Sequence, residues 1–464
     1  MTQANPIQFG IYRPDNRCSR GESTLSKASE PTFQPVSAMD YLPRAELQTL
    51  QLLRLREMVQ RAWERVPLFR ARLEERGLNP ECIQSLDDLP KLPFSAKADL
   101  RDHYPFGLFA SPMREIVRLH ASSGTTGKPI VVAYTQADVE VWSSVMARCF
   151  AACGLHEGDV IQNSYGYGLF TGGLGAHYGA ERLGAAVIPT SGGNTDRQIM
   201  VICDFCVTAI CCTPSYFLHL VDRAEQLGVD LRKAPIRAGV FGAEPWTEQM
   251  RRHIEQAAGI KAFDIYGLSE IIGPGVGIEC VQQDGLHIFE DHFYPEIIDP
   301  VTEQPLPEGA EGELVLTTLS KQAMPMIRYR TRDISALMPG VCRCGRSLRR
   351  IRRIGRRSDD MLIIRGINVF PSQIETVLLQ VEGTLPHYQI VLTREHGLDQ
   401  MEVQVEVTAG MFSDTVGAME SFQRKLAEIM ERALQIRVQI TLVEPHTLER
   451  SEGKARRIID RRQS

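Results

Sequence analysis

The sequence lacks the segments that would place it in or across a membrane. No stretch approaches the roughly 20 consecutive apolar residues that a membrane helix needs, and the first residues lack the basic and apolar parts of a signal peptide. Eleven cysteines in 464 residues do not suggest a disulfide scaffold. A net charge of −5 gives no overall attraction to nucleic acid or to an anionic membrane. We therefore expect a cytoplasmic protein that binds neither.

The residues that are present suit a large protein with more than one domain. Hydrophobic residues make up 43% of the chain and charged residues 23%, as in ordinary globular proteins. Residues 1–36 are polar and aperiodic, which predicts a disordered extension. Helical and strand-like stretches alternate between residues 136 and 241, so we expect a layered α/β domain over residues 37–357, with a β-rich subdomain from about 285. Residues 358–464 predict a small α+β domain of βαββαβ order.

Most of the cysteines lie in apolar surroundings. This placement predicts buried, reduced thiols in the core at Cys149, Cys153, Cys203, Cys206, Cys211 and Cys212. Cys203 and Cys206 also have the spacing of a redox motif, but the apolar residues on both sides favour a buried helix and strand.

A loop rich in glycine and hydroxyl side chains lies between two apolar stretches, at residues 116–119 and 130–133, which predicts strand, loop, strand. The loop consists of Ser122, Ser123, Gly124, Thr125, Thr126, Gly127 and Lys128. Glycines let the backbone approach a ligand, and backbone N–H groups beside hydroxyls can cradle an anion. The common P-loop needs Ser or Thr after its lysine, and here Pro129 follows. The loop indicates phosphate binding, although a turn-rich surface hairpin fits it when taken alone.

Two further motifs follow predicted strands. Tyr266-Gly-Leu-Ser-Glu270 comes after an apolar stretch, and Phe241-Gly-Ala-Glu-Pro-Trp246 ends another strand in a glycine turn. Ligands in open α/β sheets bind at such carboxyl ends. An aromatic ring there can stack on a base, and a carboxylate can hold Mg²⁺ against phosphate. Asp333 suits the two hydroxyls of a ribose. Each motif alone also fits a structural loop or a loop ion pair.

Together, and in this order, the motifs resemble those of the adenylate-forming superfamily of acyl-CoA synthetases. The closest resemblance is to the phenylacetate–coenzyme A ligase family, and it extends from about residue 37 to the end of the chain. The segments that carry it are residues 121–129, 165–181, 191–193, 266–270, 358–361, 365–372 and 450–454.

The resemblance implies a ligase that works in two steps. A carboxylate attacks the α-phosphate of ATP to give an acyl-adenylate and pyrophosphate, and coenzyme A then displaces AMP to give a thioester. Residues 122–128 would hold the β- and γ-phosphates, with Thr126 as a catalytic residue, and Glu270 would position Mg²⁺. Asp333 would bind the ribose. The other residues that would bind the nucleotide are Gly242, Ala243, Glu244, Asp264, Ile265, Tyr266, Gly267 and Ser269.

The same resemblance assigns two residues of the small domain. Lys454 would reach the carboxylate and the α-phosphate as charge develops, and Asp359 would be the hinge about which the small domain turns between the two steps. The family has one glycine–arginine pair before Ser-Asp-Asp, whereas this chain has Gly355-Arg356-Arg357. We favour Arg357 as the ribose contact, and Arg356 stays an alternative. The arginine-rich segment that ends here fits either the phosphates of coenzyme A or a solvated basic surface.

The segment Tyr165-Gly-Tyr-Gly-Leu-Phe170 predicts the kind of acid. It is aromatic and apolar, its glycines leave space for a flat ring, and it has no Lys or Arg to meet a second carboxylate. By resemblance, Tyr165, Phe170, Ala243 and Ile265 would line the acyl pocket. An aromatic monocarboxylic acid, phenylacetate first, is expected. The alternatives are another aryl acid such as a benzoate, acyl transfer to a carrier protein, and a non-catalytic adenylate-binding sensor. Family members also suggest a homodimer.

Four soft donors indicate a structural metal site. Cys280, His287, Cys342 and Cys344 could hold Zn²⁺ in a tetrahedron, and some relatives carry zinc at matching positions. The spacing Cys342-Arg-Cys344 is tighter than the usual C-x₂-C. Four unrelated reduced side chains are the alternative.

Overall fold

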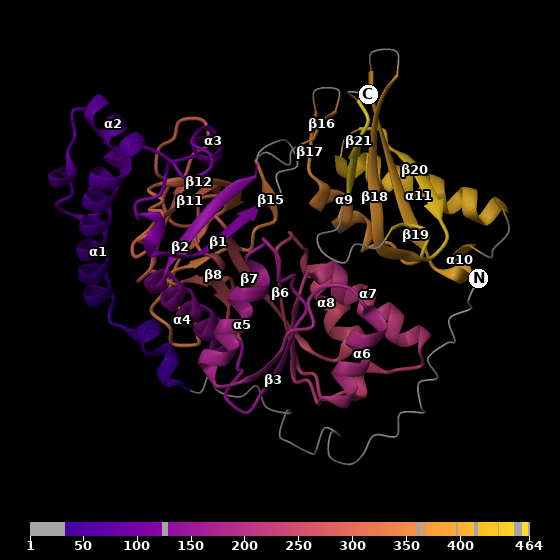
Figure 1. The fold of residues 1–464 in the computed structure, drawn as a ribbon. Helices are drawn as coiled ribbons and strands as arrows, with labels where there is room; N and C mark the ends of the chain where they lie inside the picture. Colours follow the sequence, from indigo (N-terminus) through magenta and orange to yellow (C-terminus); the bar gives the residue numbers. More distant parts are fainter. Residues whose placement is uncertain are drawn as a thin grey trace, which may run out of the picture.

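The chain folds into a large layered body and a small C-terminal body, as Figure 1 shows for the computed structural model. The structure describes residues 33–122, 129–358, 362–364, 367–395, 398–412, 416–434, 436–449 and 457–462. The expected fold class, an α/β domain with a β-rich subdomain and a small α+β domain, is confirmed.

A nine-stranded sheet lies at the centre of the large body, in the order β13-β14-β9-β8-β7-β6-β5-β3-β4. The strands β3 to β7 are parallel to one another, and β8, β9, β14 and β13 continue the sheet as antiparallel strands. The strands are β3 (Val160–Asn163), β4 (Ala186–Ile188), β5 (Ala209–Cys212), β6 (Ala238–Gly242), β7 (Lys261–Leu268), β8 (Gly273–Glu279), β9 (Leu286–Ile288), β13 (Leu337–Met338) and β14 (Arg350–Ile351).

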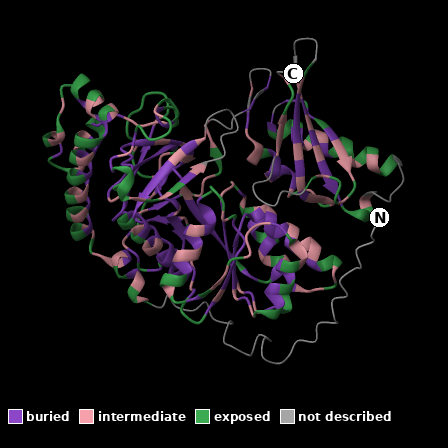
Figure 2. Ribbon diagram, viewed as in Figure 1, coloured by how far each residue is buried: buried purple, intermediate pink, exposed green. Residues whose placement is uncertain are grey.

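Helices cover both faces of this sheet. Successive side chains of a strand point to opposite faces, so Val240 of β6 packs in one core cluster and Phe241 in another. The first cluster includes residues of α4 (Gln136–Ala152) and α5 (Gly172–Leu183). The second is built with α6 (Thr195–Asp204), α7 (Pro214–Gln226) and α8 (Glu248–Ala258). Burial on both faces explains why these strands read as continuous apolar runs, and Figure 2 shows them buried.

Smaller sheets and the N-terminal helices complete the large body. A hairpin of β1 (Ile116–Ser122) and β2 (Ile130–Thr135) brackets the glycine-rich loop, and a four-stranded sheet has the order β10-β11-β12-β15. Its strands are β10 (Phe293–Ile298), β11 (Gly312–Thr318), β12 (Tyr329–Ser335) and β15 (Arg356–Arg357). The helices are α1 (Arg44–Arg65), α2 (Pro67–Glu75) and α3 (Lys97–Asp102), with short 3₁₀ helices η1 (Pro35–Tyr41), η2 (Pro80–Cys82), η3 (Leu86–Lys91), η4 (Met113–Glu115) and, later in the chain, η5 (Leu231–Lys233).

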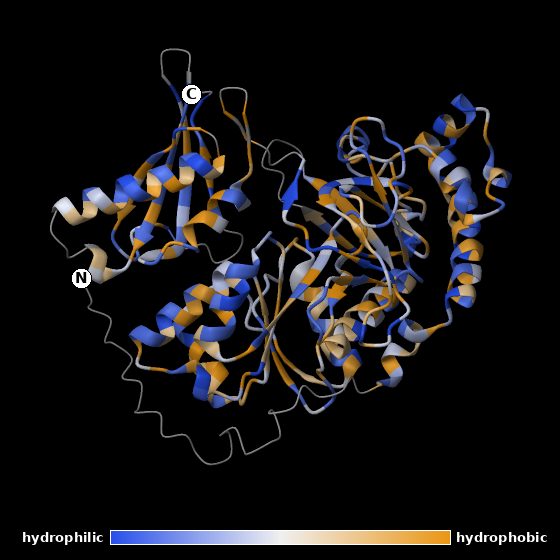
Figure 3. Ribbon diagram, turned by 180° about the vertical axis from the view of Figure 1, so that it is seen from behind, coloured by the Kyte–Doolittle hydropathy of each residue, from blue (hydrophilic) through white to orange (hydrophobic). Residues whose placement is uncertain are grey.

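The small body has its own core and a sheet of order β20-β19-β18-β21. Its elements are β16 (Leu362–Ile364), β17 (Ile367–Val369), α9 (Pro371–Leu378), β18 (Thr384–Glu395), β19 (Leu398–Val407), α10 (Ala409–Phe412), α11 (Val416–Leu434), β20 (Gln439–Val443) and β21 (Ile458–Asp460). The helix α11 is two-sided, because Leu426, Met430 and Leu434 are buried in the core cluster while most of its other described residues are exposed. Figure 3 shows this mixture of hydrophilic and hydrophobic residues on the outer helices.

The expected core thiols are largely found. Cys149, Cys153, Cys211 and Cys212 are buried and free, and Cys203 is too. Cys206 differs, because it is disulfide-bonded. Among the described residues, no helix combines the length and the apolar character needed to cross a membrane.

Candidate active site

A glycine turn at the carboxyl end of β6 forms one wall of the site. Gly242 pairs with Ile265 of the neighbouring parallel strand β7, so the two predicted motifs lie side by side. A Cβ atom added at Gly242 would lie 2.4 Å from the Ile265 carbonyl oxygen, and this closeness accounts for the glycine. Ala243 has the left-handed φ of 69°, a conformation that costs a non-glycine residue free energy and often occurs at ligand sites. The Glu244 carboxylate accepts a hydrogen bond from the Ser215 N–H at 2.8 Å.

The end of β7 meets the β-rich sheet at Asp333. Tyr266 Oη donates a hydrogen bond to Asp333 Oδ2 at 2.6 Å, and Arg357 Nη1 lies 3.3 Å from Asp333 Oδ1. Burial, and then the Asp333 carboxylate, raise the pKa of the Tyr266 phenol well above its usual value, so the phenol stays protonated and donates. Asp333 and Arg357 are register partners in β12 and β15. Arg356 points elsewhere: it pairs with Glu311 and lies over the Phe370 ring.

Glu270 is buried beside the same sheet, two residues after β7 ends. Its main-chain oxygen accepts a hydrogen bond from Lys321 Nζ at 3.1 Å, and its carboxylate is one of the causes that raise the pKa of the buried Tyr329 phenol, after burial itself. Burial lowers the pKa of Lys321 to about 8. The Ser269 hydroxyl lies 3.2 Å from that of Thr171, and this contact ties the turn to α5. A carboxylate held in this way can ligate a hard cation such as Mg²⁺.

The carboxylate of Asp264, a residue that the sequence assigns to the nucleotide site, has partners that the sequence reasoning did not identify. The Asp264 carboxylate accepts hydrogen bonds from Trp246 Nε1 and from Arg353 Nε, both at 3.0 Å. Arg353 also lies over the Trp246 ring. Asp264 therefore braces the glycine turn against the segment that leads to Arg357. The partner of Asp264 is 89 residues away in the chain, so only the position of Trp246 directly after the turn could have hinted at it.

Three predicted parts of the site lie in residues that the structure does not describe: the phosphate loop, the hinge and the catalytic lysine. The strands β1 and β2 pair up to Ser122 and Ile130, as strand, loop, strand requires. Residues Ser123, Gly124, Thr125, Thr126, Gly127 and Lys128 lie outside the described residues, and so do Asp359 and Lys454.

The aromatic segment lies against the glycine turn. Tyr165 is buried, and burial raises the pKa of its phenol well above the usual value, while the Gly242 backbone opposes the shift. The Tyr165 hydroxyl is buried near the turn and has no hydrogen-bond partner among the described residues. Phe170 is 37% exposed and therefore lies at the rim. The Leu169 carbonyl accepts hydrogen bonds from the Ala121 N–H and the His120 ring, both at 3.0 Å, and so fastens this segment to β1.

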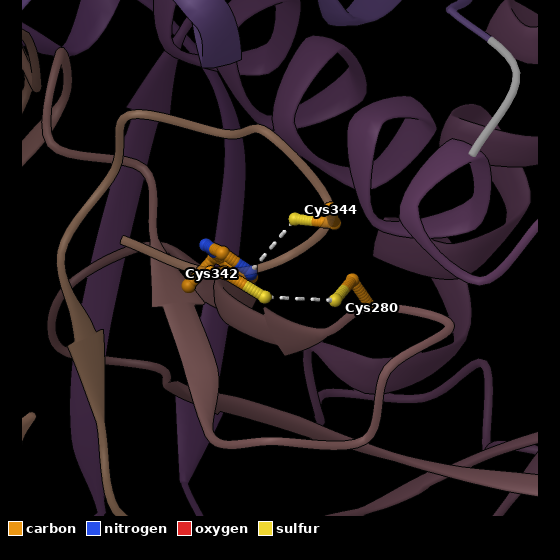
Figure 4. A group of neighbouring side chains, drawn as sticks. Cys280, Cys342 and Cys344 are labelled. Atoms are coloured by element: carbon orange, nitrogen blue, oxygen red, sulfur yellow. Dashed lines mark hydrogen bonds between the residues drawn. The ribbon is translucent and has the colours of Figure 1, made fainter. Parts of the chain in front are cut away.

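The four soft donors come together at the edge of the nine-stranded sheet. Cys280 follows β8, His287 is in β9, and Cys342 and Cys344 lie in the loop between β13 and β14. Cys280 Sγ is 3.7 Å from Cys342 Sγ, and His287 Nε2 is 3.4 Å from Cys344 Sγ. Figure 4 shows the three cysteine side chains gathered together. All four ligand atoms lie within 4.8 Å of one another, and all four residues are buried.

This spacing fits zinc. A tetrahedral ion with bonds of about 2.3 Å to sulfur and about 2.0 Å to nitrogen separates two sulfurs by about 3.8 Å, and a sulfur from a nitrogen by about 3.5 Å. The two measured separations agree with these edges.

The arginine-rich segment before Ser358 is mostly committed to carboxylates. Six of its eight arginines form ion pairs within the large domain: Arg346, Arg349, Arg350, Arg353, Arg356 and Arg357. These pairs give neither the predicted coenzyme A site nor the solvated basic surface much support, because the charges are satisfied internally.

Comparison with known proteins agrees with this arrangement. The family model described as AMP-binding enzyme matches residues 80–324, and that described as AMP-binding enzyme C-terminal domain matches residues 366–462. A phenylacetate-coenzyme A ligase from Pseudomonas putida is 54% identical over 413 residues, which is 89% of this chain and 93% of the relative. Ligases of the same name from Escherichia coli and Thermus thermophilus are 50% and 49% identical, over 90% and 93% of this chain and 95% and 99% of theirs.

Solved structures of a 2-hydroxyisobutyryl-CoA ligase have the same fold. The structure in the postadenylation state, with R3-HIB-AMP bound, superposes with a TM-score of 0.86 at 30% identity, over 93% of this chain and 94% of that one. The structure of that ligase in the thioesterification state gives a TM-score of 0.68 at 31% identity, over 94% and 95%. These matches show that the chain is an AMP-forming acid–thiol ligase and belongs to the phenylacetate–coenzyme A ligase family.

Proposed function

We propose that the acid this ligase activates is phenylacetate. The observation that carries the proposal is the buried Tyr165 hydroxyl, which has no hydrogen-bond partner among the described residues, in a chain that is 49–54% identical to four phenylacetate-coenzyme A ligases over about nine-tenths of its length. Ile265 faces the Gly242 turn from β7, so the acyl pocket would be apolar apart from the phenol. No lysine or arginine occurs in residues 165–170 to bind a second carboxylate.

The nucleotide would bind across the carboxyl ends of β6 and β7. Adenine would lie against Ala243 and Tyr266, and the ribose hydroxyls would donate to Asp333, which Tyr266 and Arg357 already hold in place. Glu270 would hold Mg²⁺, which neutralises charge on the phosphates when it is bound. Because two anions must meet in the first step, fixed positive groups around the phosphates are what the reaction needs most. Residues 122–128 and Lys454 would provide them.

A substrate panel tests the choice of acid. We expect the highest kcat/KM with phenylacetate when ATP and coenzyme A are supplied and both AMP and the thioester mass are measured. A benzoate preferred over phenylacetate would assign the other aryl-acid alternative. An adenylate that forms but passes to no coenzyme A would favour a carrier protein as acceptor.

Lys454→Ala tests the adenylation lysine. The contact exists mainly in the transition state, so kcat for adenylate formation should fall by about 10²–10³ while both KM values change little. Pre-made phenylacetyl-adenylate and coenzyme A should still give thioester at close to the wild-type rate. Loss of both half-reactions together, or of neither, would contradict this role.

The small domain would turn between the two steps about Asp359. The relative's structures, named for a postadenylation and a thioesterification state, support two arrangements, and this chain matches the first better, with TM-scores of 0.86 and 0.68. Proline fixes φ near −65°, so Asp359→Pro should retain acyl-adenylate formation and impair thioester formation. Equal rates in both would argue against a hinge there.

Zinc would be held by Cys280, His287, Cys342 and Cys344, because two of the separations between their donor atoms match edges of a zinc tetrahedron and all four atoms lie within 4.8 Å of one another. It would tie β8 and β9 to the loop before β14 and take no part in the reaction. Elemental analysis should find about one zinc per chain, and the double variant Cys342→Ser/Cys344→Ser should lose it and melt at a lower temperature. A wild-type preparation that is free of zinc and fully active would overturn this assignment.

The family resemblance supports a homodimer in the cytoplasm. Light scattering on the purified protein at micromolar concentration tests whether it is a dimer. A monomer mass under those conditions would contradict it.

A further inference from the structure

The helix α7 contacts the small domain along a single stripe. Ser215, Asp222 and Gln226 are separated by seven and four residues, the spacing that places side chains on one face of a helix. Each of them contacts a different segment of the small domain. In Figure 1 the small domain lies directly above α7 and α8.

The middle contact is a charge-assisted hydrogen bond. His387 Nε2, in β18, lies 3.1 Å from Asp222 Oδ2, and because an ionised carboxylate only accepts, the imidazole donates. The His387 side chain is 11% exposed and the Asp222 side chain 32%. Water therefore screens this pair less than an ordinary surface pair.

The outer contacts extend the stripe in both directions. Gln226 Nε2 is 2.9 Å from His446 Nε2. At the other end Arg457 Nη2 is 3.4 Å from Ser215 Oγ. Arg457 is held within the small domain by an ion pair to Glu375 and a 3.0 Å hydrogen bond to Tyr388.

Two features connect the stripe to the rest of the molecule. The Ser215 N–H donates to Glu244, next to Ala243 in the glycine turn, so the stripe begins at the nucleotide site. Leu379, at the end of α9, packs on the apolar cluster that α7 shares with α6 and α8. Among the described residues, the contacts that hold the small domain therefore include one apolar contact, at Leu379, and the three polar contacts of α7.

We propose that Ser215, Asp222 and Gln226 form a docking stripe that holds the small domain in the orientation of the first half-reaction, with Asp222 and His387 as its positioning pair. The inference rests on the proposed turning of the small domain. A rotation about residue 359 would move β18 and Arg457 relative to α7, so these contacts stabilise one orientation and not the other. A contact present in only one of two states shifts the population toward that state.

The consequence is an effect on one half-reaction. Asp222→Lys places a cation against His387, so the docked orientation loses population. We expect adenylate formation, measured as pyrophosphate release with phenylacetate and ATP, to slow by about tenfold or more. Thioester formation from pre-made phenylacetyl-adenylate and coenzyme A should stay at the wild-type rate or rise.

Two variants separate docking from general damage. Glu225→Lys makes the same change of charge at an exposed residue of the same helix and should leave both half-reactions and the melting temperature near wild type. The charge-swapped double variant Asp222→Lys/His387→Glu restores an opposite-charge pair and should recover most of the lost adenylation rate. A structural defect at Asp222 would not be rescued in this way.

The half-reaction assays of Lys454→Ala and Asp222→Lys test the two-orientation proposal and the docking stripe separately. If Lys454→Ala does not separate the two half-reactions in the same assays, the two-orientation proposal fails and the docking stripe fails with it. If Lys454→Ala separates them but Asp222→Lys behaves like Glu225→Lys, or slows both half-reactions equally, the docking stripe alone is wrong.

Discussion

Replacing Tyr266 by phenylalanine keeps the ring that would stack on adenine and removes only the hydroxyl that holds Asp333. In the structure Tyr266 Oη lies 2.6 Å from Asp333 Oδ2, and both residues are buried. A hydrogen bond to a charged group contributes about 1.5–3 kcal/mol. If all of it served to orient the carboxylate for the ribose, binding would weaken about 10- to 150-fold, since 1.4 kcal/mol is tenfold.

The expected loss is near the lower end of that range. Arg357 lies 3.3 Å from the other carboxylate oxygen and would still restrain Asp333 in the variant. We therefore expect Tyr266→Phe to raise the Kd for AMP about tenfold in isothermal titration calorimetry. Tyr216→Phe is a matched control, because it removes a buried hydroxyl that bonds the Gly193 carbonyl instead.

A comparison of AMP with 2′-deoxy-AMP tests whether Tyr266 acts through Asp333. The wild-type protein should bind 2′-deoxy-AMP less tightly than AMP, because Asp333 then loses one of the two ribose hydroxyls that would donate to it. In Tyr266→Phe this preference should shrink, since the carboxylate is less well placed. If the variant weakens AMP and 2′-deoxy-AMP by the same factor, Tyr266 does not act through Asp333.

Three further changes test other parts of the site. Phe170→Ala, at a ring that is 37% exposed, should lower kcat/KM for phenylacetate about tenfold and leave the KM for ATP unchanged; equal losses for both substrates would make Phe170 a packing residue. Burial lowers the pKa of Lys321 to about 8 from 10.5, so between these pH values the unfolded chain binds more protons than the folded one. The free energy of unfolding should therefore rise with pH in this range, by at most about 3 kcal/mol. Urea unfolding should show this rise in the wild type relative to Lys321→Met, and equal slopes would contradict it. Gly242→Ala would place a methyl group 2.4 Å from the Ile265 carbonyl oxygen, so β6 and β7 must separate. The melting temperature and the affinity for AMP should both fall. If both stay unchanged, the two strands accommodate the methyl group without cost.

The sequence predicted the parts of the fold that depend on local pattern. The apolar runs that end at Phe241 and Ile265 became β6 and β7, and because adjacent parallel strands end at one edge, their motifs had to meet. The cluster of Cys280 with Cys342 could be anticipated from residue type together with the resemblance to relatives that carry zinc at matching positions.

Contacts between distant segments could not be predicted in this way. The bonds from Asp264 to Arg353 and from Asp222 to His387 join residues 89 and 165 positions apart, and neither pair has a distinctive local pattern. The ion pairs of the arginine-rich segment could not be predicted for a related reason. A run of charge reads as a surface or a phosphate site, and only the fold reveals that acidic partners such as Glu290 lie opposite.

The buried cysteines have a consequence for a ligase whose product is a thioester. An acyl-adenylate reacts with any thiolate within reach, and Cys211 and Cys212 lie at the carboxyl end of β5, beside the strand that carries the glycine turn. Burial raises the pKa of both thiols well above the usual value, so at neutral pH they carry their protons and are poor nucleophiles. The apolar core thus protects the enzyme from acylating itself, and leaves the activated acid to the thiol that arrives from solution.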